Sequence, residues 1–112
     1  MLTVCKRNDQ VVQVDVEGII EASQRREMTQ QLEGLVDEDF LHFEINMSGV
    51  QYIDSVGVGI FVGLRNKLLK RKGTINVINL PVQVERLFKV TRLHDVLCKP
   101  LLNNKLEVIN NE

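Results

Sequence analysis

Hydrophobic positions near the N-terminus alternate with polar ones at a period of two. Residues 2–5 alternate in this way, and so do residues 11–16 from the second valine onward. Such alternation predicts strands with one buried face, and the Asn8-Asp9 pair between them favours a turn. Residues 2–16 are therefore predicted to form a β-hairpin, and Gly18 ends its second strand.

The period then changes to that of a helix. Met28, Leu32, Leu35 and Val36 fall at i, i+4, i+7 and i+8, which forms an apolar stripe, and Ser23 is the expected N-cap. The acidic run at residues 37–39 is expected to be a solvated loop.

Two further strands and a long helix follow. A dense apolar run at residues 40–47 predicts a central strand, and Tyr52-Ile53 leads from it to Asp54-Ser55. A helical pattern then runs to Gly73, the expected C′ residue after a basic last turn. Residues 74–78 alternate again and predict a strand.

The C-terminal part is predicted to hold one more helix and one more strand. Pro81 fits the first turn of a helix whose apolar face includes Leu87. Residues 96–98 are expected to form a short edge strand. The polar segment at about residues 100–112 is compatible with a weak helix or with fraying.

The order β-β-α-β-α-β-α-β predicts an α/β fold. Strand–helix–strand crossovers require a mixed, mainly parallel sheet of four to five strands with helices packed on it. With 112 residues, the chain is expected to be one domain spanning residues 1–112. Functional sites in such sheets collect at the carboxyl ends of strands beside helix N-termini, which here means residues 52–59.

Composition makes several classes of function less favoured, although local charged patches could still matter. The formal net charge of −1 provides no strong field to attract nucleic acid or an anionic membrane. Cys5 and Cys98 are isolated, so neither a disulfide framework nor a zinc site is expected. The sequence shows no signal peptide and no apolar run of ~20 residues, so we expect a cytoplasmic protein without membrane insertion.

Ser55 lies where the central strand gives way to the long helix. Backbone N–H groups at a helix start have no internal partners and carry the positive end of the dipole, so they can receive a phosphate. Gly57, Gly59 and Gly63 each cost about 1 kcal/mol relative to Ala in a helix interior, and close approach of another backbone would explain them. Local chemistry leaves open a purely structural interpretation, in which Ser55 is an N-cap and the glycines only allow close packing.

A nucleotide site is a weaker interpretation of the same glycines. Their spacing is similar to a dinucleotide fingerprint, but the next strand ends at Asn79 without the carboxylate that would hold a ribose. The chain is also too short for two mononucleotide-binding halves. We expect no cofactor.

The segment VQYIDSVGVG, at residues 50–59, resembles the core signature of STAS domains, and the most similar group is the anti-sigma-factor antagonists of bacterial sporulation and general-stress pathways. The likeness covers most of the chain and includes the Gly18 turn, the start of the strand at Gly73-Thr74, and residues 84–96. It implies the STAS fold and a regulatory binding module rather than an enzyme.

In that family the serine directly after the aspartate is phosphorylated by a partner kinase. The resemblance implies that this residue is Ser55, with Asp54 as the adjoining carboxylate. The implied partner is a serine kinase of the histidine-kinase-like ATPase type that doubles as an anti-sigma factor. It binds the unmodified form and not the phosphorylated form, and a phosphatase resets Ser55. The resemblance does not identify the process that the switch regulates. It could be transcription through a sigma factor, biofilm formation, a secretion system or a second-messenger enzyme.

The expected docking surface combines the turn before the long helix, the start of that helix and the helix that begins near Pro81. Its predicted members are Glu21, Tyr52, Asp54, Ser55, Val56, Gly57, Val58, Gly59, Val84 and Phe88.

The chain departs from the family pattern at two single positions and in one turn. Val56 stands where many relatives carry a second Ser or Thr, and Arg92 replaces a common glycine. Ile19-Ile20-Glu21 replaces a more acidic turn, so Glu21 is the acidic residue that is left in this turn. The family also includes accessory subunits of lipid-transport ATPases, so a STAS subunit that binds an ATPase or transporter component without phosphorylation is the alternative.

Other chemistry-bearing residues have plainer interpretations. His94 and Cys98 fall at i and i+4, but no orienting group for a catalytic pair can be identified. His42 has no second ligand at a suitable spacing, so a structural role is expected and no metal site is predicted. The basic run at residues 67–72 is expected to be a solvated helix end.

Overall fold

The computed structural model describes residues 1–98, which form a four-stranded sheet and five helical segments. The strands are β1 (Leu2–Asn8), β2 (Val11–Ile20), β3 (His42–Ile53) and β4 (Thr74–Ile78). The helices are α1 (Arg25–Asp37), α2 (Ser55–Leu69), α3 (Val82–Val90) and α4 (His94–Leu97), and a 3₁₀ turn, η1 (Ala22–Gln24), precedes α1.

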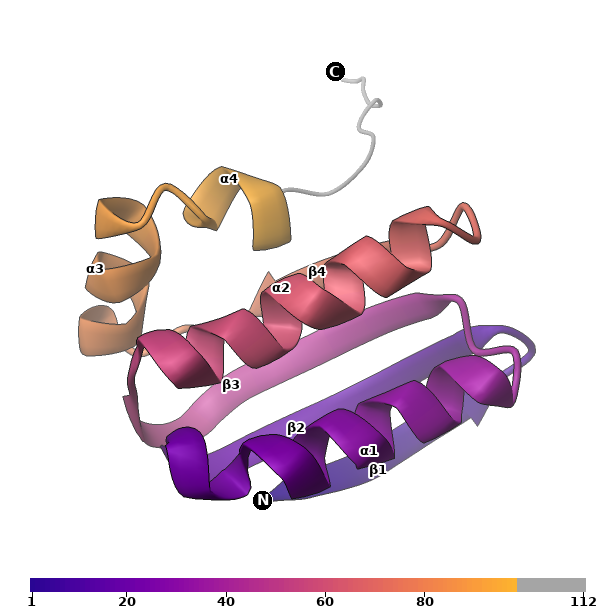
Figure 1. The fold of residues 1–112 in the computed structure, drawn as a ribbon, viewed down its shortest axis with the longest axis horizontal. Coiled ribbons are helices and arrows are strands. Elements are labelled where there is room, and N and C mark those ends of the chain that lie inside the picture. Colours follow the sequence, from indigo (N-terminus) through magenta and orange to yellow (C-terminus); the bar gives the residue numbers. More distant parts are fainter. Residues whose placement is uncertain (99–112) are drawn as a thin grey trace.

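The sheet has the spatial order β1-β2-β3-β4. β1 pairs antiparallel with β2, whereas β2, β3 and β4 are parallel. The prediction of a mixed, mainly parallel sheet is confirmed (Figure 1). β2 and β3 run in one direction, so their carboxyl ends at Ile20 and Ile53 meet next to the start of α2, whereas the shorter β4 ends at Ile78, opposite Asn46 of β3.

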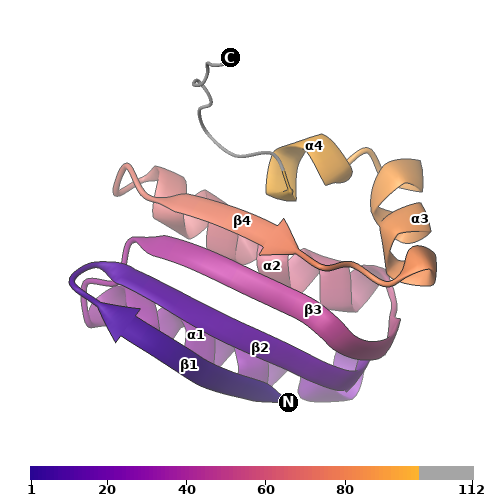
Figure 2. The same ribbon diagram turned by 180° about the vertical axis from the view of Figure 1, so that it is seen from behind.

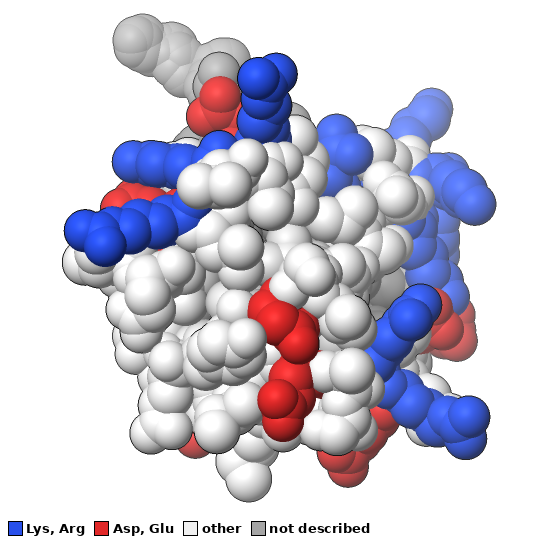
Figure 3. All heavy atoms as spheres, turned by 60° about the vertical axis from the view of Figure 1, so that its left-hand side comes forward, with Lys and Arg blue, Asp and Glu red and all other residues white. Residues whose placement is uncertain are grey.

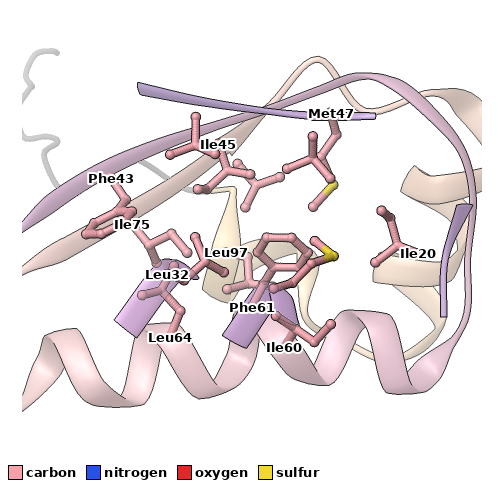
Figure 4. Close-up of a cluster of buried hydrophobic side chains, with 14 of the residues drawn as sticks. Ile20, Leu32, Phe43, Ile45, Met47, Ile60, Phe61, Leu64, Ile75 and Leu97 are labelled. Carbon is pink, nitrogen blue, oxygen red and sulfur yellow. The ribbon is translucent and has the colours of Figure 1, made fainter. Parts of the chain in front are cut away.

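α1 and α2 lie side by side across one face of the sheet, and α3 and α4 lie beyond β3 and β4 (Figures 1 and 2). The core lies between the sheet and the helices. It consists of every second side chain along the strands, on the face toward the helices, and of the apolar stripes of the helices. Figure 4 shows Phe43, Ile45 and Met47 of β3 facing Phe61 and Leu64 of α2. Phe61, Ile45 and Met47 are 0% exposed.

The opposite face of the sheet is not covered by α1 and α2 (Figure 2), and it carries the polar positions of the same alternation. There Asn46 Nδ2 donates to Asp15 Oδ1 at 3.1 Å, and Asn79 Nδ2 donates to Asn46 Oδ1 at 3.1 Å. Period-two patterning therefore separates a dry face under the helices from a hydrogen-bonded face on the other side.

The two central strands run further than predicted. β2 continues past Gly18, which has φ of +85°, to Ile20, and its pairing with β3 shifts register between Gly18 and Ile19. β3 ends at Ile53 rather than at residue 47. A glycine can end a strand or mark a bulge within it, and Gly18 lies at a register shift within β2.

Several predicted helix boundaries are also corrected. Glu21, not Ser23, is the N-cap of the first helical segment, and the Gln24 side chain accepts its backbone N–H at 3.0 Å. α2 ends at Leu69, and Lys72, with φ of +61°, takes the left-handed position expected for Gly73. Gly73 is needed for a different reason: a Cβ there would collide with the carbonyl oxygen of Leu41.

The predicted edge strand at residues 96–98 is wrong. His94–Leu97 form α4, and Leu97 is 0% exposed in the core (Figure 4). A three-residue apolar run fits a strand or a helical turn equally well, and here burial beside α2 decides for the turn. The segment at residues 100–112 lies outside the described residues.

Candidate functional site around Ser55

The site lies where β2 and β3 end and α2 begins. The backbone N–H of Asp54 donates to the carbonyl of Ile20 at 3.2 Å, which ties the end of β3 to the end of β2. The next residue, Ser55, is the first residue of α2 and is exposed. The parallel pairing thus fixes the direction in which the helix start points.

Asp54, and not Ser55, caps α2. Its backbone is extended, with φ of −104° and ψ of −176°, and its Oδ1 accepts the N–H of Gly57 at 2.8 Å. The interpretation of Ser55 as an N-cap is therefore wrong. The Ser55 hydroxyl makes no hydrogen bond with any residue that the structure describes, so it is left at the surface beside the positive end of the helix.

Gly57 is required by packing inside the chain. A Cβ at this position would lie 2.6 Å from the Ile20 carbonyl oxygen and 2.7 Å from Ile53 Cγ1. The close approach expected from the sequence is thus made by β2 of the same molecule. Gly59 and Gly63 differ, since a Cβ at either would meet open space.

An open hollow of about 430 Å³ lies beside Ser55, between the end of β3 and α3. Tyr52, Ser55, Gln83 and Leu87 line it, together with Asp54 and parts of the core. Gln83 Nε2 donates to the Gln51 carbonyl at 3.4 Å and so links α3 to the end of β3. No Lys or Arg among the described residues lines this hollow.

The predicted docking residues divide by exposure. Glu21, Tyr52, Ser55 and Gly59 are exposed, and Asp54 and Val56 are half-buried. All six lie at the end of the molecule where the parallel strands finish. Their partner contacts remain a proposal.

The remaining four residues are buried. Val58 is 2% exposed, Val84 and Phe88 are 0% exposed, and Gly57 is buried against β2. The apolar faces of α2 and α3 point into the core, although Val84 also lines the hollow beside Ser55. Contact of these four residues with a partner stays a prediction. Gly57, Val58 and Phe88 support the surface from beneath.

Sequence reasoning missed Ile19, Gln83 and Leu87. Ile19 is 45% exposed and pairs in register with Tyr52, which is 51% exposed. Ile19 looks like one half of a buried Ile-Ile pair in the sequence, and only the irregularity at Gly18 shows which of the two isoleucines is buried. Gln83 and Leu87 are one helical turn apart, so their shared lining of one hollow could have been noticed.

The His94–Cys98 pair lacks the chemistry of a nucleophile. Burial, followed by the charges of Glu85 and Asp95, raises the pKa of the Cys98 thiol to about 11. The imidazole of His94 in α4 lies 3.7 Å from a carboxylate oxygen of Glu85 in α3 and 3.7 Å from one of its neighbour Asp95. At neutral pH the Cys98 thiol is therefore protonated and weakly reactive.

The described residues offer no other candidate centre. Within them, no group of three or more His, Cys, Asp or Glu side chains is arranged to hold a metal ion. His42 Nδ1 lies 2.9 Å from Thr74 Oγ1, a contact between β3 and β4 that fits a structural role. None of the helices in residues 1–98 is long and apolar enough to cross a membrane.

The family model described as "Mlab, STAS domain" matches residues 4–103. The chain is 30% identical over 92 residues to the anti-sigma-B factor antagonist of Bacillus subtilis (strain 168), covering 82% of this chain and 84% of that protein. An anti-sigma factor antagonist from Mycobacterium paratuberculosis has a similar crystal structure, with a TM-score of 0.76, 25% identity, and coverage of 90% of this chain and 86% of that one.

The fold is also similar to that of the Bacillus cell fate determinant SpoIIAA in its phosphorylated form. The TM-score is 0.71 at 14% identity, over 87% of this chain and 88% of that one. At this identity the likeness shows the fold alone.

Proposed function

The chain belongs to the STAS domain family, and from this premise we propose that it is a partner-switching regulator controlled by phosphorylation of Ser55. Its homologues are anti-sigma factor antagonists. In the proposed cycle the unphosphorylated form binds an anti-sigma factor that is also a serine kinase of the histidine-kinase-like ATPase type. Phosphorylation of Ser55 abolishes binding, and a phosphatase restores it.

The proposal rests on the different roles of Asp54, which caps α2, and Ser55, which is exposed beside it. Asp54 caps α2 through its 2.8 Å bond from Gly57 N–H, so Ser55 is not needed to hold the helix start. The exposed hydroxyl is therefore free to be a phosphoacceptor. The kinase supplies nucleotide, metal and base, and this chain acts as substrate and binder rather than as catalyst.

The surroundings of Ser55 give a reason for phosphorylation to prevent binding. A phosphoserine adds about −1.5 to −2 charge at pH 7. Among the described residues the adjacent hollow offers no Lys or Arg to pair with it, and Asp54 places a carboxylate one residue away. In the free protein, water and the helix N-terminus stabilise the phosphate.

A covering partner removes that water. Burying an uncompensated charge costs roughly 3–5 kcal/mol, which would weaken binding about a hundredfold or more. No refolding of the domain is required for this switch.

The test compares Ser55→Ala with Ser55→Asp. Pull-down with Ser55→Ala as bait identifies the partner, and isothermal titration with the purified partner then gives both affinities. We expect Ser55→Ala to bind constitutively and Ser55→Asp to bind about a hundredfold more weakly. Equal affinities, or no phosphate on Ser55 by mass spectrometry after incubation with lysate and ATP, would refute the switch.

The resemblance to STAS domains also carries one alternative function. In it the chain is an accessory STAS subunit that binds an ATPase or transporter component without phosphorylation. In that case the Ser55→Ala and Ser55→Asp baits would recover the same ATPase in equal amounts, and Ser55 would remain unmodified.

A further inference from the structure

A hollow of about 240 Å³ lies between α1 and α2, on the helical face of the molecule that Figure 1 looks onto. Its apolar lining consists of Leu32 of α1 and of Ile60 and Leu64 of α2, and all three are buried. Gly59 and Gly63 also line it from α2. This hollow is called the α1–α2 groove.

The two glycines of the α1–α2 groove are not needed for packing inside the described chain. A Cβ at Gly59 or Gly63 would meet open space, whereas a Cβ at Gly57 would collide with β2. Glycine is a poor residue for a helix interior, and these two bring no closer contact within residues 1–98. What they permit is the close approach of another backbone to α2 from outside.

The charged residues of the α1–α2 groove stand on one ridge of α1. Arg25, Thr29 and Glu33 line the groove and follow one another at intervals of four residues. Such residues share one side of a helix, so Arg25 and Glu33 are about 12 Å apart along the axis, with Thr29 between them. Neither Arg25 nor Glu33 forms an ion pair with another described residue. The four residues that line the groove from α2 are uncharged.

The charges of α1 run against the dipole of the helix. Arg25 and Arg26 stand in the first turn, where Glu27 is the one acidic residue. Glu33 and Asp37 lie toward the other end, and the last turn contains no basic residue. Because the helix start carries partial positive charge and the helix end partial negative charge, this order is unfavourable in a single α1. A second α1 lying antiparallel brings opposite charges together at both ends.

The wider charge distribution does not indicate a partner of one sign. Seen from the end of the molecule at which α1 and α2 begin, acidic and basic side chains are scattered around a largely uncharged area (Figure 3). The formal net charge of the chain is only −1. The complementary surface therefore has to carry both signs, in the reverse order to α1, and α1 itself turned around has this order.

We propose that the α1–α2 groove receives α1 of a second copy of this chain, so that two molecules associate through their helical faces. A two-fold axis near Thr29 makes the two α1 helices antiparallel and places Arg25 of each copy beside Glu33 of the other. Gly59 and Gly63 leave room for the approaching helix. This association goes beyond the proposed switch and does not depend on phosphorylation of Ser55.

Charge reversal tests the two-fold pairing. In a dimer, Arg25→Glu or Glu33→Arg places like charges together twice, and each should raise the dissociation constant about tenfold or more. The double variant Arg25→Glu/Glu33→Arg restores both pairs with reversed signs, so it should stay within about threefold of the parent. Sedimentation velocity of the full chain over a dilution series measures all three constants. Arg86→Glu, at an exposed position of α3, is the matched control and should change the constant less than about twofold.

Unfolding would not imitate this result. Arg25→Glu puts an acidic residue at the start of α1 and Glu33→Arg puts a basic residue near its end, and the helix dipole favours both changes in the monomer. Urea denaturation at low concentration should therefore find neither variant less stable than the parent, while both associate more weakly.

A mixture of the two single variants gives a sharper test. The Arg25→Glu chain is acidic at both positions and the Glu33→Arg chain is basic at both, so a pair with one of each satisfies both contacts. Mixing them should restore association to within about threefold of the parent, although each alone associates weakly.

Gly63→Leu tests the α1–α2 groove itself. The new side chain enters open space, so the variant should stay folded, but it takes the place of the second helix. We expect the dissociation constant to rise about tenfold or more. An unchanged constant would show that the two copies do not meet at this groove.

Two further results would overturn the proposal. The first is a parent chain that sediments as a monomer at every concentration up to about 1 mM, which would leave the groove to residues 99–112 or to a different protein. The second is a double variant and a mixture that both associate as weakly as the single variants, because the pairing across a two-fold axis requires that both recover.

Discussion

Replacement of Gly57 by alanine gives the most direct test of how the start of α2 is held in place. A Cβ at this position would lie 2.6 Å from the Ile20 carbonyl oxygen, 2.7 Å from Ile53 Cγ1 and 3.0 Å from Ile20 Cγ2. The first of these atoms belongs to the backbone of β2, so it cannot turn away as a flexible side chain would. The helix start must move instead.

Gly59, two residues further along α2, is the matched control. A Cβ there meets nothing within 4 Å, so Gly59→Ala gains only the helix propensity of alanine, about 1 kcal/mol. Gly57→Ala has a similar gain but also introduces an overpacked contact, which typically costs about 1–3 kcal/mol. The difference between the two variants therefore isolates the steric cost.

Urea denaturation followed by circular dichroism measures both free energies of unfolding. We expect Gly59→Ala to be more stable than the parent, and Gly57→Ala to be less stable than Gly59→Ala by about 1–3 kcal/mol. If Gly57→Ala were as stable as Gly59→Ala, the close approach of α2 to β2 would not constrain the site. A shifted helix start should also weaken partner binding, since Ser55 and Asp54 move with it.

Two further predictions concern the cap and the half-buried thiol. Asp54→Ala removes the acceptor of the Gly57 N–H and should lower the free energy of unfolding by about 1 kcal/mol. Asp54→Asn retains an acceptor and should lower it less. If urea denaturation gives both variants the same free energy of unfolding as the parent, the assignment of the cap is contradicted. Cys98 should resist alkylation by iodoacetamide in the native protein at pH 7, and its rate should rise with pH toward about 11 because only the thiolate reacts. Mass spectrometry of the Cys98 peptide measures this rate, and fast alkylation at pH 7 that matches the denatured chain would show that the thiol is neither buried nor shifted.

Most of the architecture follows from periodicity that can be read in the sequence. Alternation at period two located β1, the first part of β2, and β4, and the apolar stripe through Met28 and Leu32 located α1. In β2, β4 and α1 these periods mark a buried face, because the residues on that face are mostly apolar. β1 lies at the edge of the sheet, and its Thr3, Val4 and Cys5 are exposed. The switch from strand to helix at Asp54-Ser55 was equally visible, and it placed the candidate site at the correct end of the sheet.

Boundaries and roles at the site were decided by contacts between distant segments. Gly18 could end a strand or bend it, and the pairing of β2 with β3 selected the bend, which left Ile19 exposed and Ile20 buried. Residues 94–97 became a helical turn because Leu97 could be buried beside α2. Short segments have little intrinsic preference, so the burial offered by the rest of the chain determines their form.

The order of the residues is enough to place a serine at the start of a helix, at the carboxyl edge of a parallel sheet. The folded chain adds that Asp54 caps that helix, that Gly57 fits against the Ile20 carbonyl, and that Val58, Val84 and Phe88 are buried. The reason is physical: local propensity and periodicity act within a few residues, whereas capping geometry, steric contact and exposure depend on which distant atoms arrive at the same place.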